Sequence, residues 1–144
     1  LERTITGLVI TGDSAGGNLT IVTTNQLMNE PADVPVVVQA PIYPVASDTS
    51  QHSSFAMFTE GFLLTGAAMA WFNDQYGGDA GLDPLRDSGR EYAAHLVQLG
   101  TEVVYLEFPG IIHGFTTLRK AIPSGQRDLE AFLDATKLMV ERYR

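Results

Sequence analysis

A serine between two glycines is the first chemical lead in this sequence. Residues 12–16 read Gly-Asp-Ser-Ala-Gly, a G-x-S-x-G pattern that directly follows the apolar, β-branched run of residues 5–11. In a nucleophile elbow the chain turns sharply from a strand into a helix, so the serine side chain is exposed while its neighbours crowd the backbone. Glycine on both sides relieves that crowding. The pattern predicts that Ser14 is a nucleophile; the alternative is an ordinary N-cap serine that begins a helix.

A histidine base is the first partner that such a serine needs, because its hydroxyl is a weak nucleophile until a base takes the proton. His113 lies on a glycine-bounded loop, residues 109–115, directly after the strand-like residues 102–108. Loops at strand ends are where the sites of α/β proteins collect. His95, inside a predicted helix, and His52, in a polar stretch, are interpreted as solvated or packing side chains.

A carboxylate that orients the histidine is the second partner, and Asp83 is the candidate. It follows Ser14 and precedes His113, the order expected for an elbow serine. Pro84 holds Asp83 in an extended conformation, which places it at a strand-to-loop transition. Asp87 is better explained by a helix with a capping box from Ser88 to Glu91, since its charge suits a helix N-terminus. An ordinary Asp-Pro turn is the alternative for Asp83.

Four motifs together resemble a known family, the bacterial hormone-sensitive-lipase-like esterases of the α/β-hydrolase superfamily. They stand in the family's order at residues 12–19, 41–44, 83–87 and 113–115, and the resemblance runs over nearly the whole chain. It implies that Ser14 is the nucleophile, Asp83 the triad acid and His113 the base. It also implies that the backbone N–H of Ala15 is one donor of the oxyanion hole.

Two departures from the family pattern accompany the match. The family's His-Gly-Gly loop, which completes the oxyanion hole upstream of the nucleophile, has no counterpart in the few residues before Ser14. In the family a buried strand also lies between the helix predicted to end near Tyr76 and the Asp-Pro-Leu motif. Here only the six residues 77–82 fill that space, too few for a strand and its connections. We expect roughly twenty residues to be missing near Asp79 and Ala80.

Composition and charge narrow the function classes. A chain of 144 residues that is 44% hydrophobic is long enough to bury a core, and we expect one domain over residues 1–144. The net charge of -8 argues against nucleic-acid and membrane partners. Prolines and polar residues interrupt every apolar run, so no membrane span is expected. With no cysteine and three scattered histidines, we expect no metal and no other cofactor.

Alternating strand and helix patterns predict an α/β fold with a mostly parallel sheet flanked by helices. Strands are expected at residues 5–11, 36–40 and 102–108, and helices at 16–29, 66–76, 88–99 and 125–143. Two apolar helix stripes are interpreted as core: Tyr92, Leu96 and Leu99 in one helix, and Leu129, Phe132, Leu133, Thr136, Met139 and Tyr143 in the last. Core packing is also preferred to an acyl pocket for the aromatic and methionine residues at Phe55, Met57, Phe58, Phe62, Met69, Trp71 and Phe72.

The sequence thus predicts a serine carboxylesterase of the α/β-hydrolase fold that hydrolyses small or short-acyl esters through an acyl-enzyme. Asp13, Ile112 and Phe115 are the candidate substrate contacts. A cytoplasmic location is expected, and the oligomeric state stays open, with a homodimer as one option.

Two alternatives to an enzyme remain. One is a non-catalytic ligand receptor of the same fold, in which the triad histidine is replaced, although His113 is retained here. The other is an inactive, truncated or purely structural chain, which both departures favour. A dinucleotide-binding fold fits less well, because the glycine spacing after residue 12 is wrong and no acidic residue follows at a second strand end.

Overall fold

A computed structural model describes residues 4–47, 53–58, 65, 67–68 and 85–143 of the chain. Its elements, in chain order, are β1 (Leu8–Asp13), α1 (Ala15–Asn29), β2 (Val36–Ile42), α2 (Ser53–Phe58), α4 (Leu85–Gln98), α5 (Phe115–Leu118) and α6 (Gly125–Tyr143).

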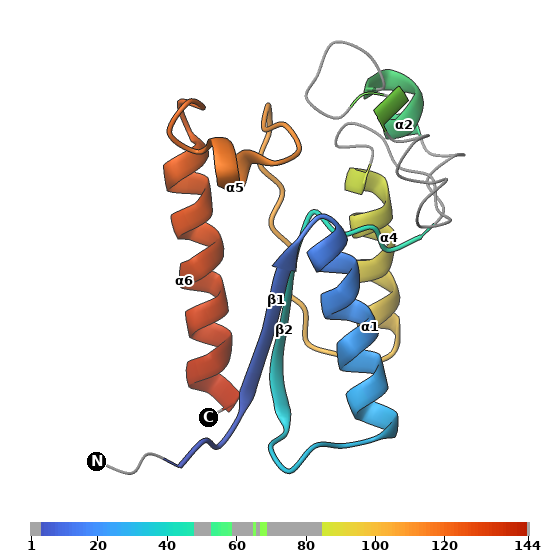
Figure 1. Ribbon diagram of the computed structural model, residues 1–144, viewed down its shortest axis with the longest axis vertical. Coiled ribbons are helices and arrows are strands. Elements are labelled where there is room, and N and C mark those ends of the chain that lie inside the picture. The colour runs from blue at the N-terminus through green and yellow to red at the C-terminus, as the bar shows by residue number, and fades with distance from the viewer. Residues whose placement is uncertain (1–3, 48–52, 59–64, 66, 69–84, 144) are drawn as a thin grey trace.

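The two strands form a parallel sheet with α1 as the connection between them (Figure 1). The register runs from Leu8 opposite Val36 to Asp13 opposite Ile42, with one irregularity between Leu8 and Val9. Parallel strands need such a crossover. Because both strands run the same way, their carboxyl ends lie at one end of the sheet, directly before Ser14 and Tyr43.

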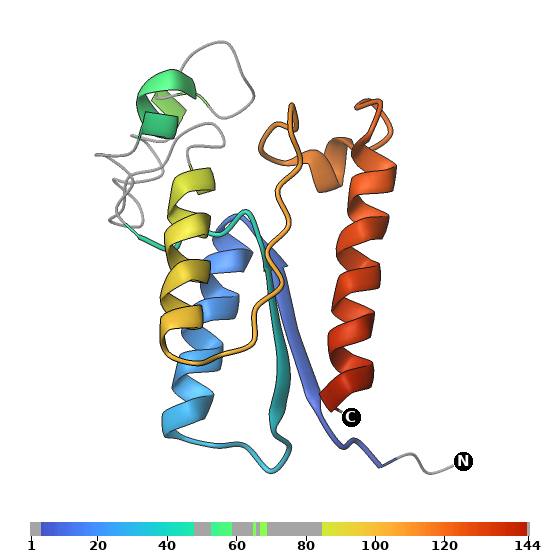
Figure 2. The same cartoon turned by 180° about the vertical axis from the view of Figure 1, so that it is seen from behind.

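Helices cover both sides of the two strands. α6 lies on one side and α1 and α4 on the other, as the two opposite views show (Figures 1 and 2). The fully buried apolar side chains are few among the described residues: Ile21, Val38, Ala40, Leu85 and Phe115. No helix in this part of the chain is long and apolar enough to cross a membrane.

The predicted helices agree with the structure except at one start. The helices expected at 16–29 and 125–143 correspond to α1 and α6. α4 begins at Leu85, so the expected capping box at Ser88 is wrong. Ser88 is fully buried inside the helix, and its Oγ instead accepts hydrogen bonds of 3.1 Å from the backbone N–H groups of Ala46 and Ser47. Asp87 does lie in the first turn of α4, as predicted.

The strand predicted at residues 102–108 is not formed in the structure. The segment is extended and climbs from the end of α4 toward α5, but the sheet of the described residues has only β1 and β2 (Figure 2). Its β-branched composition favours a strand, yet a strand also needs a neighbour to receive its backbone hydrogen bonds.

Several stretches predicted as buried are more open than expected. β1 alternates between half-buried and exposed residues, with Val9 41% exposed. In the two helix stripes, Leu99 and Leu133 are exposed, while Tyr92 and Leu96 are half-buried. Met57 is 63% exposed, so its interpretation as core is wrong.

Some predictions lie outside the described residues. They are nearly all of the helix expected at 66–76, the seam at 79–80, His52 and Asp83. The same holds for Phe62, Met69, Trp71 and Phe72, and for the side chains of Phe55 and Phe58. His95, by contrast, is described, and it is exposed on α4 as predicted.

Candidate active site

Ser14 lies at the turn between β1 and α1, in a backbone conformation that non-glycine residues rarely adopt. Its φ is 56° and its ψ is -117°. Its backbone N–H donates to the carbonyl of Ile42 at 3.0 Å, and its carbonyl accepts from the N–H of Asn18 at 3.1 Å. The side chain makes no capping hydrogen bond to α1. The geometry therefore fits a strained strand-to-helix elbow rather than an ordinary helix cap.

Close packing around the elbow explains two of its glycines. A Cβ at Gly12 would lie 2.5 Å from the carbonyl oxygen of Gly16, and a Cβ at Gly17 would lie 2.9 Å from the Cα of Pro44. Gly16 itself has open space where its Cβ would be, with no atom within 4 Å. The expectation that both glycines flanking Ser14 relieve crowding is thus met at Gly12 but wrong at Gly16, and the second crowded position is Gly17.

His113 meets Ser14 across 99 positions of sequence. Its Nε2 lies 2.8 Å from the Oγ of Ser14, and its side chain is only 6% exposed. The loop that carries it turns at Gly110 and Gly114, both with a φ of 75°, a left-handed conformation that favours glycine. The structure thus brings two of the predicted site residues within hydrogen-bond distance.

Tyr43 links the serine turn to the histidine loop. Its ring lies against the imidazole of His113, with centroids 4.5 Å apart. Its hydroxyl donates to Asp13 Oδ2 at 2.9 Å and lies 2.5 Å from Oγ1 of Thr116, which also reaches Asp13 at 3.4 Å. Asp13 precedes the serine and Thr116 is three residues past the histidine. We call Asp13, Tyr43 and Thr116 the polar clamp.

The hydroxyl of Tyr43 stays protonated throughout the neutral range. Partial burial and the neighbouring Asp13 carboxylate, partly offset by the hydrogen bond with Thr116, raise the pKa of Tyr43 to about 12. It is therefore a hydrogen-bond donor at neutral pH. Tyr43 also has a φ of 34°, unusual for a residue with a side chain. Such strain persists only where the surroundings fix the conformation, as the clamp does here.

The other predicted site residues are placed as follows. Ala15 is the first residue of α1, where backbone N–H groups have no partner within the helix. Asp13 belongs to the polar clamp. Ile112 is half-buried beside His113, and Phe115 is buried against the rings of Tyr43 and Phe108.

Sequence reasoning gave no role to Tyr43 or Thr116. The motif at residues 41–44 drew attention to Tyr43, and its place directly after a strand, level with the end of β1, was the available signal. Thr116 carries no such signal, since it depends on the turn at Gly114. Among the described residues, no group of three or more His, Cys, Asp or Glu side chains could hold a metal ion.

A sequence model of the α/β-hydrolase fold family matches residues 4–82 and, in a second match, residues 78–117. The chain belongs to the α/β-hydrolase fold family. The resemblance read from the four motifs is thereby confirmed at the level of the family, and so is the predicted fold class.

Relatives of this α/β hydrolase include named esterases. It is 28% identical to an ethyl acetate hydrolase of Pseudomonas putida, an alignment that covers 89% of this chain and 49% of that one. It is 33% identical to the carboxylic ester hydrolase LipN of Mycobacterium tuberculosis, over 77% of this chain and 38% of that one. This chain thus spans about half the length, or less, of these curated relatives.

A solved structure shows the same arrangement of elements. One of two fungal esterases from Rhizomucor miehei superposes with a TM-score of 0.81 at 26% identity, over 95% of this chain and 51% of the other.

Proposed function

We propose that this α/β hydrolase acts as a serine esterase on small carboxylic esters, with residues 1–144 as one catalytic domain. The observation that carries the proposal is the 2.8 Å approach of His113 Nε2 to the Oγ of a serine in a strained elbow. The esterase names of the relatives support the same reaction class.

In the proposed reaction Ser14 Oγ attacks the ester carbonyl carbon while Nε2 of His113 takes the hydroxyl proton. The tetrahedral intermediate places negative charge on the carbonyl oxygen, and we assign one stabilising donor to the N–H of Ala15. When the C–O bond to the alcohol breaks, His113 hands its proton to the leaving oxygen. Water, activated by the same imidazole, then releases the acid from the acyl-enzyme.

Asp83 remains the proposed triad acid. Its role would be to hold the His113 ring in the tautomer that leaves Nε2 free of a proton and to stabilise the charged imidazole. Asp13 fits better as part of the polar clamp than as a substrate contact, because its carboxylate already accepts from Tyr43. Ile112 and Phe115 remain proposed contacts on the histidine side.

A direct test compares turnover of a short chromogenic ester by the natural chain and by Ser14→Ala. Loss of the nucleophile is expected to reduce turnover by about four to six orders of magnitude. Thr23→Ala, on the exposed side of α1, is the matched control and should leave turnover unchanged. Equal activity in Ser14→Ala and the natural chain would contradict the proposed mechanism.

A second candidate, a protein of this fold with little turnover, is favoured by one specific observation. A large cavity lies beside β2, opposite the edge that pairs with β1, and neither Ser14 nor His113 lines it. An organophosphate separates the two candidates. Stoichiometric labelling of Ser14 without ester turnover would favour the second candidate, whereas labelling with turnover would favour the esterase.

A further inference from the structure

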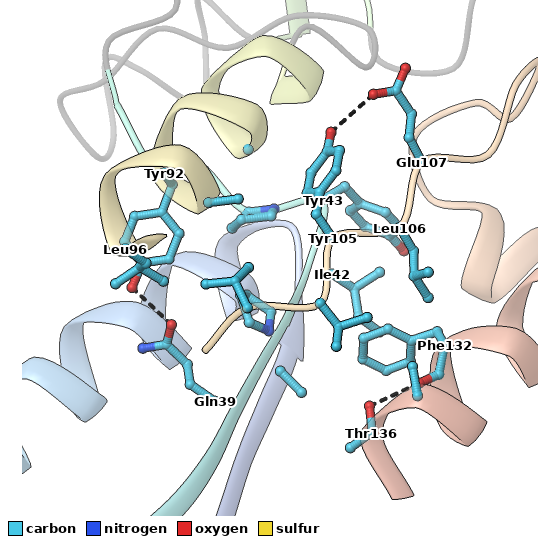
Figure 3. Close-up of a pocket in the computed structure, with 18 of the residues that line it drawn as sticks. Gln39, Ile42, Tyr43, Tyr92, Leu96, Tyr105, Leu106, Glu107, Phe132 and Thr136 are labelled. Carbon is cyan, nitrogen blue, oxygen red and sulfur yellow. Dashed lines mark hydrogen bonds between the residues drawn. The ribbon is translucent and has the colours of Figure 1, made fainter. Parts of the chain in front are cut away.

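A cavity of about 900 Å³ lies between β2, α4, α6 and the extended residues 101–112. Figure 3 shows Leu96 from α4, Ile42 from β2 and Phe132 from α6 around this space. We call it the β2 slot. It is as large as the largest ordinary ligand pockets. Because it lacks the reactive pair among its lining residues, it is not the place where an ester would meet Ser14.

Apolar faces from four directions converge on the β2 slot. Val38 and Ala40 line it from the strand, Tyr92 and Leu96 from α4, and Met139 from α6. The two helix stripes predicted as core are therefore the stripes that face the slot. Apolar stripes of this width normally pack against another layer of the protein.

The far wall of the slot has the composition of a strand but no strand partner. Val104, Tyr105 and Leu106 are 52%, 43% and 39% exposed. Within the described residues, no backbone hydrogen bond joins 102–108 to β2. A β-branched and aromatic run that is exposed and unpaired is unusual, since such residues are enriched in half-buried sheets.

Ion pairs at both ends hold this wall to the helices rather than to β2. Glu107 receives two hydrogen bonds from Arg90 of α4, at 2.7 and 2.6 Å, and these, with a hydrogen bond from Tyr105, lower its pKa against the effect of burial. Glu102 accepts from Arg142 of α6 at 2.5 Å and also from Tyr143. The wall is thus tied to α4 at one end and to α6 at the other.

The relatives carry extra residues at one point of the alignment. The match to the Pseudomonas putida enzyme is 155 positions long but covers 89% of this 144-residue chain, about 128 residues, so that enzyme has about 27 residues more. The Mycobacterium tuberculosis relative has about 32 more, from 143 positions against 77% of the chain. The two family matches end and begin at residues 78–82, which locates the extra residues there.

We infer that the β2 slot accepts one further β-strand, parallel to β2 and supplied by a segment of about 30 residues that this chain lacks between Asp79 and Ala80. Such a strand would pair with β2 on one side and with residues 102–108 on the other, and would cover the stripes of α4 and α6. Parallel strands in one sheet end at the same edge. The residues after the seam, which end at Asp83, would then leave the sheet on the side where β1, β2 and residues 102–108 lead to Ser14, Tyr43 and His113.

The test inserts the corresponding segment of the Pseudomonas putida enzyme between Asp79 and Ala80. The control inserts the same residues in scrambled order, which keeps length and composition. Amide hydrogen exchange is then measured at residues 37–42 and 102–108. We expect the native-order insert to slow exchange at both segments by at least about 100-fold and the scrambled insert to leave it unchanged. Equal exchange in all three chains, or protection of residues 102–108 without any insert, would overturn the inference.

Cysteine pairs in the chain without an insert give an independent measurement, because the natural sequence has no cysteine. Ala40→Cys is combined in turn with Val104→Cys, Tyr105→Cys and Leu106→Cys. Neighbouring strands lie about 4.8 Å apart and strands separated by one strand about twice that, whereas a disulfide needs Cα atoms within about 7 Å. We expect no disulfide on mild oxidation and efficient linking by a reagent that spans about 10 Å. Rapid disulfide formation by any pair would contradict a strand-wide slot. Neither measurement depends on ester hydrolysis.

Discussion

The two edges of β2 differ in how completely they are built. On one edge β1 pairs with β2 from Leu8 to Asp13, and the paired ends lead directly to Ser14 and Tyr43. On the other edge the β2 slot separates the strand from residues 102–108. The comparison shows that the serine and histidine can be brought together by β1, β2 and the polar clamp alone, while the packing of α4 and α6 depends on what fills the slot.

The largest effect is expected from a methyl group in the crowded elbow. In Gly12→Ala the new Cβ would lie 2.5 Å from the carbonyl oxygen of Gly16, a backbone atom that moves only if the turn moves. We expect a loss of about 1–3 kcal/mol in the free energy of unfolding. The rate of organophosphate labelling at Ser14 should fall about 100-fold, because small displacements of reacting groups are costly.

Gly16→Ala is the matched control for that variant, because its Cβ would meet no atom within 4 Å. As a helical position it should gain up to about 1 kcal/mol in stability and keep its labelling rate. If the two alanine variants behaved alike, the packing described for the elbow would be wrong.

The next effect tests the polar clamp on the paired edge. Tyr43→Phe keeps the ring beside His113 but removes the hydroxyl that reaches Asp13 and Thr116. We expect about 1–2 kcal/mol lower stability and about 10-fold slower labelling of Ser14, as the histidine loop loosens. Tyr92→Phe is the comparison on the slot side, where the hydroxyl donates to Gln39 at 2.8 Å. It should cost stability without slowing the labelling, and a slower rate in both variants would argue against a clamp specific to the site.

A pH-dependent effect is expected where α4 begins. Burial acts to raise the pKa of Asp87, but hydrogen bonds from Arg86 and Ser54 outweigh it and hold the pKa well below its usual range. A carboxyl with a lowered pKa stabilises the fold above its unfolded value near 4, and that contribution is lost as the pH falls through the folded pKa.

Asp87→Asn should therefore lower the free energy of unfolding by about 1 kcal/mol at pH 7. Urea titrations from pH 7 down to pH 2 should show the difference between variant and natural chain shrinking below about pH 4. Asp134→Asn, at an exposed position of α6, serves as the control. A difference that stayed constant over this range would mean that the ionised form of Asp87 is not what stabilises the helix.

The smallest effect is expected at the wall of the slot. Arg90→Gln breaks the two-point pair with Glu107, yet the Arg90 side chain is 50% exposed, so the loss should be only about 0.5–1 kcal/mol. The same change should speed amide exchange at residues 102–108 more than at β2. Arg127→Gln, whose side chain is 80% exposed, should change neither quantity. Faster exchange across β2 as well would show that the wall and the strand are coupled despite the slot.

The parts of this structure that follow from local sequence could be predicted, and those that need a distant partner could not. Residues 5–16 and 125–143 carry their own strand, turn and helix signals, so β1, the elbow and α6 were found. Residues 102–108 carry an equally clear strand signal, but pairing needs a neighbour that the sequence between Asp79 and Ala80 does not supply. His113 was found from its loop, whereas Thr116 joins the site only through the turn at Gly114.

The central claim is that Ser14 and His113 form a reactive pair, and mass spectrometry of the chain after treatment with a fluorophosphonate tests it most directly. We expect the intact mass to increase by one phosphonyl group, located on the peptide that contains Ser14. No adduct should form in Ser14→Ala, and labelling should be much slower in His113→Asn. An unmodified Ser14, or an adduct that forms equally in both variants, would contradict the claim.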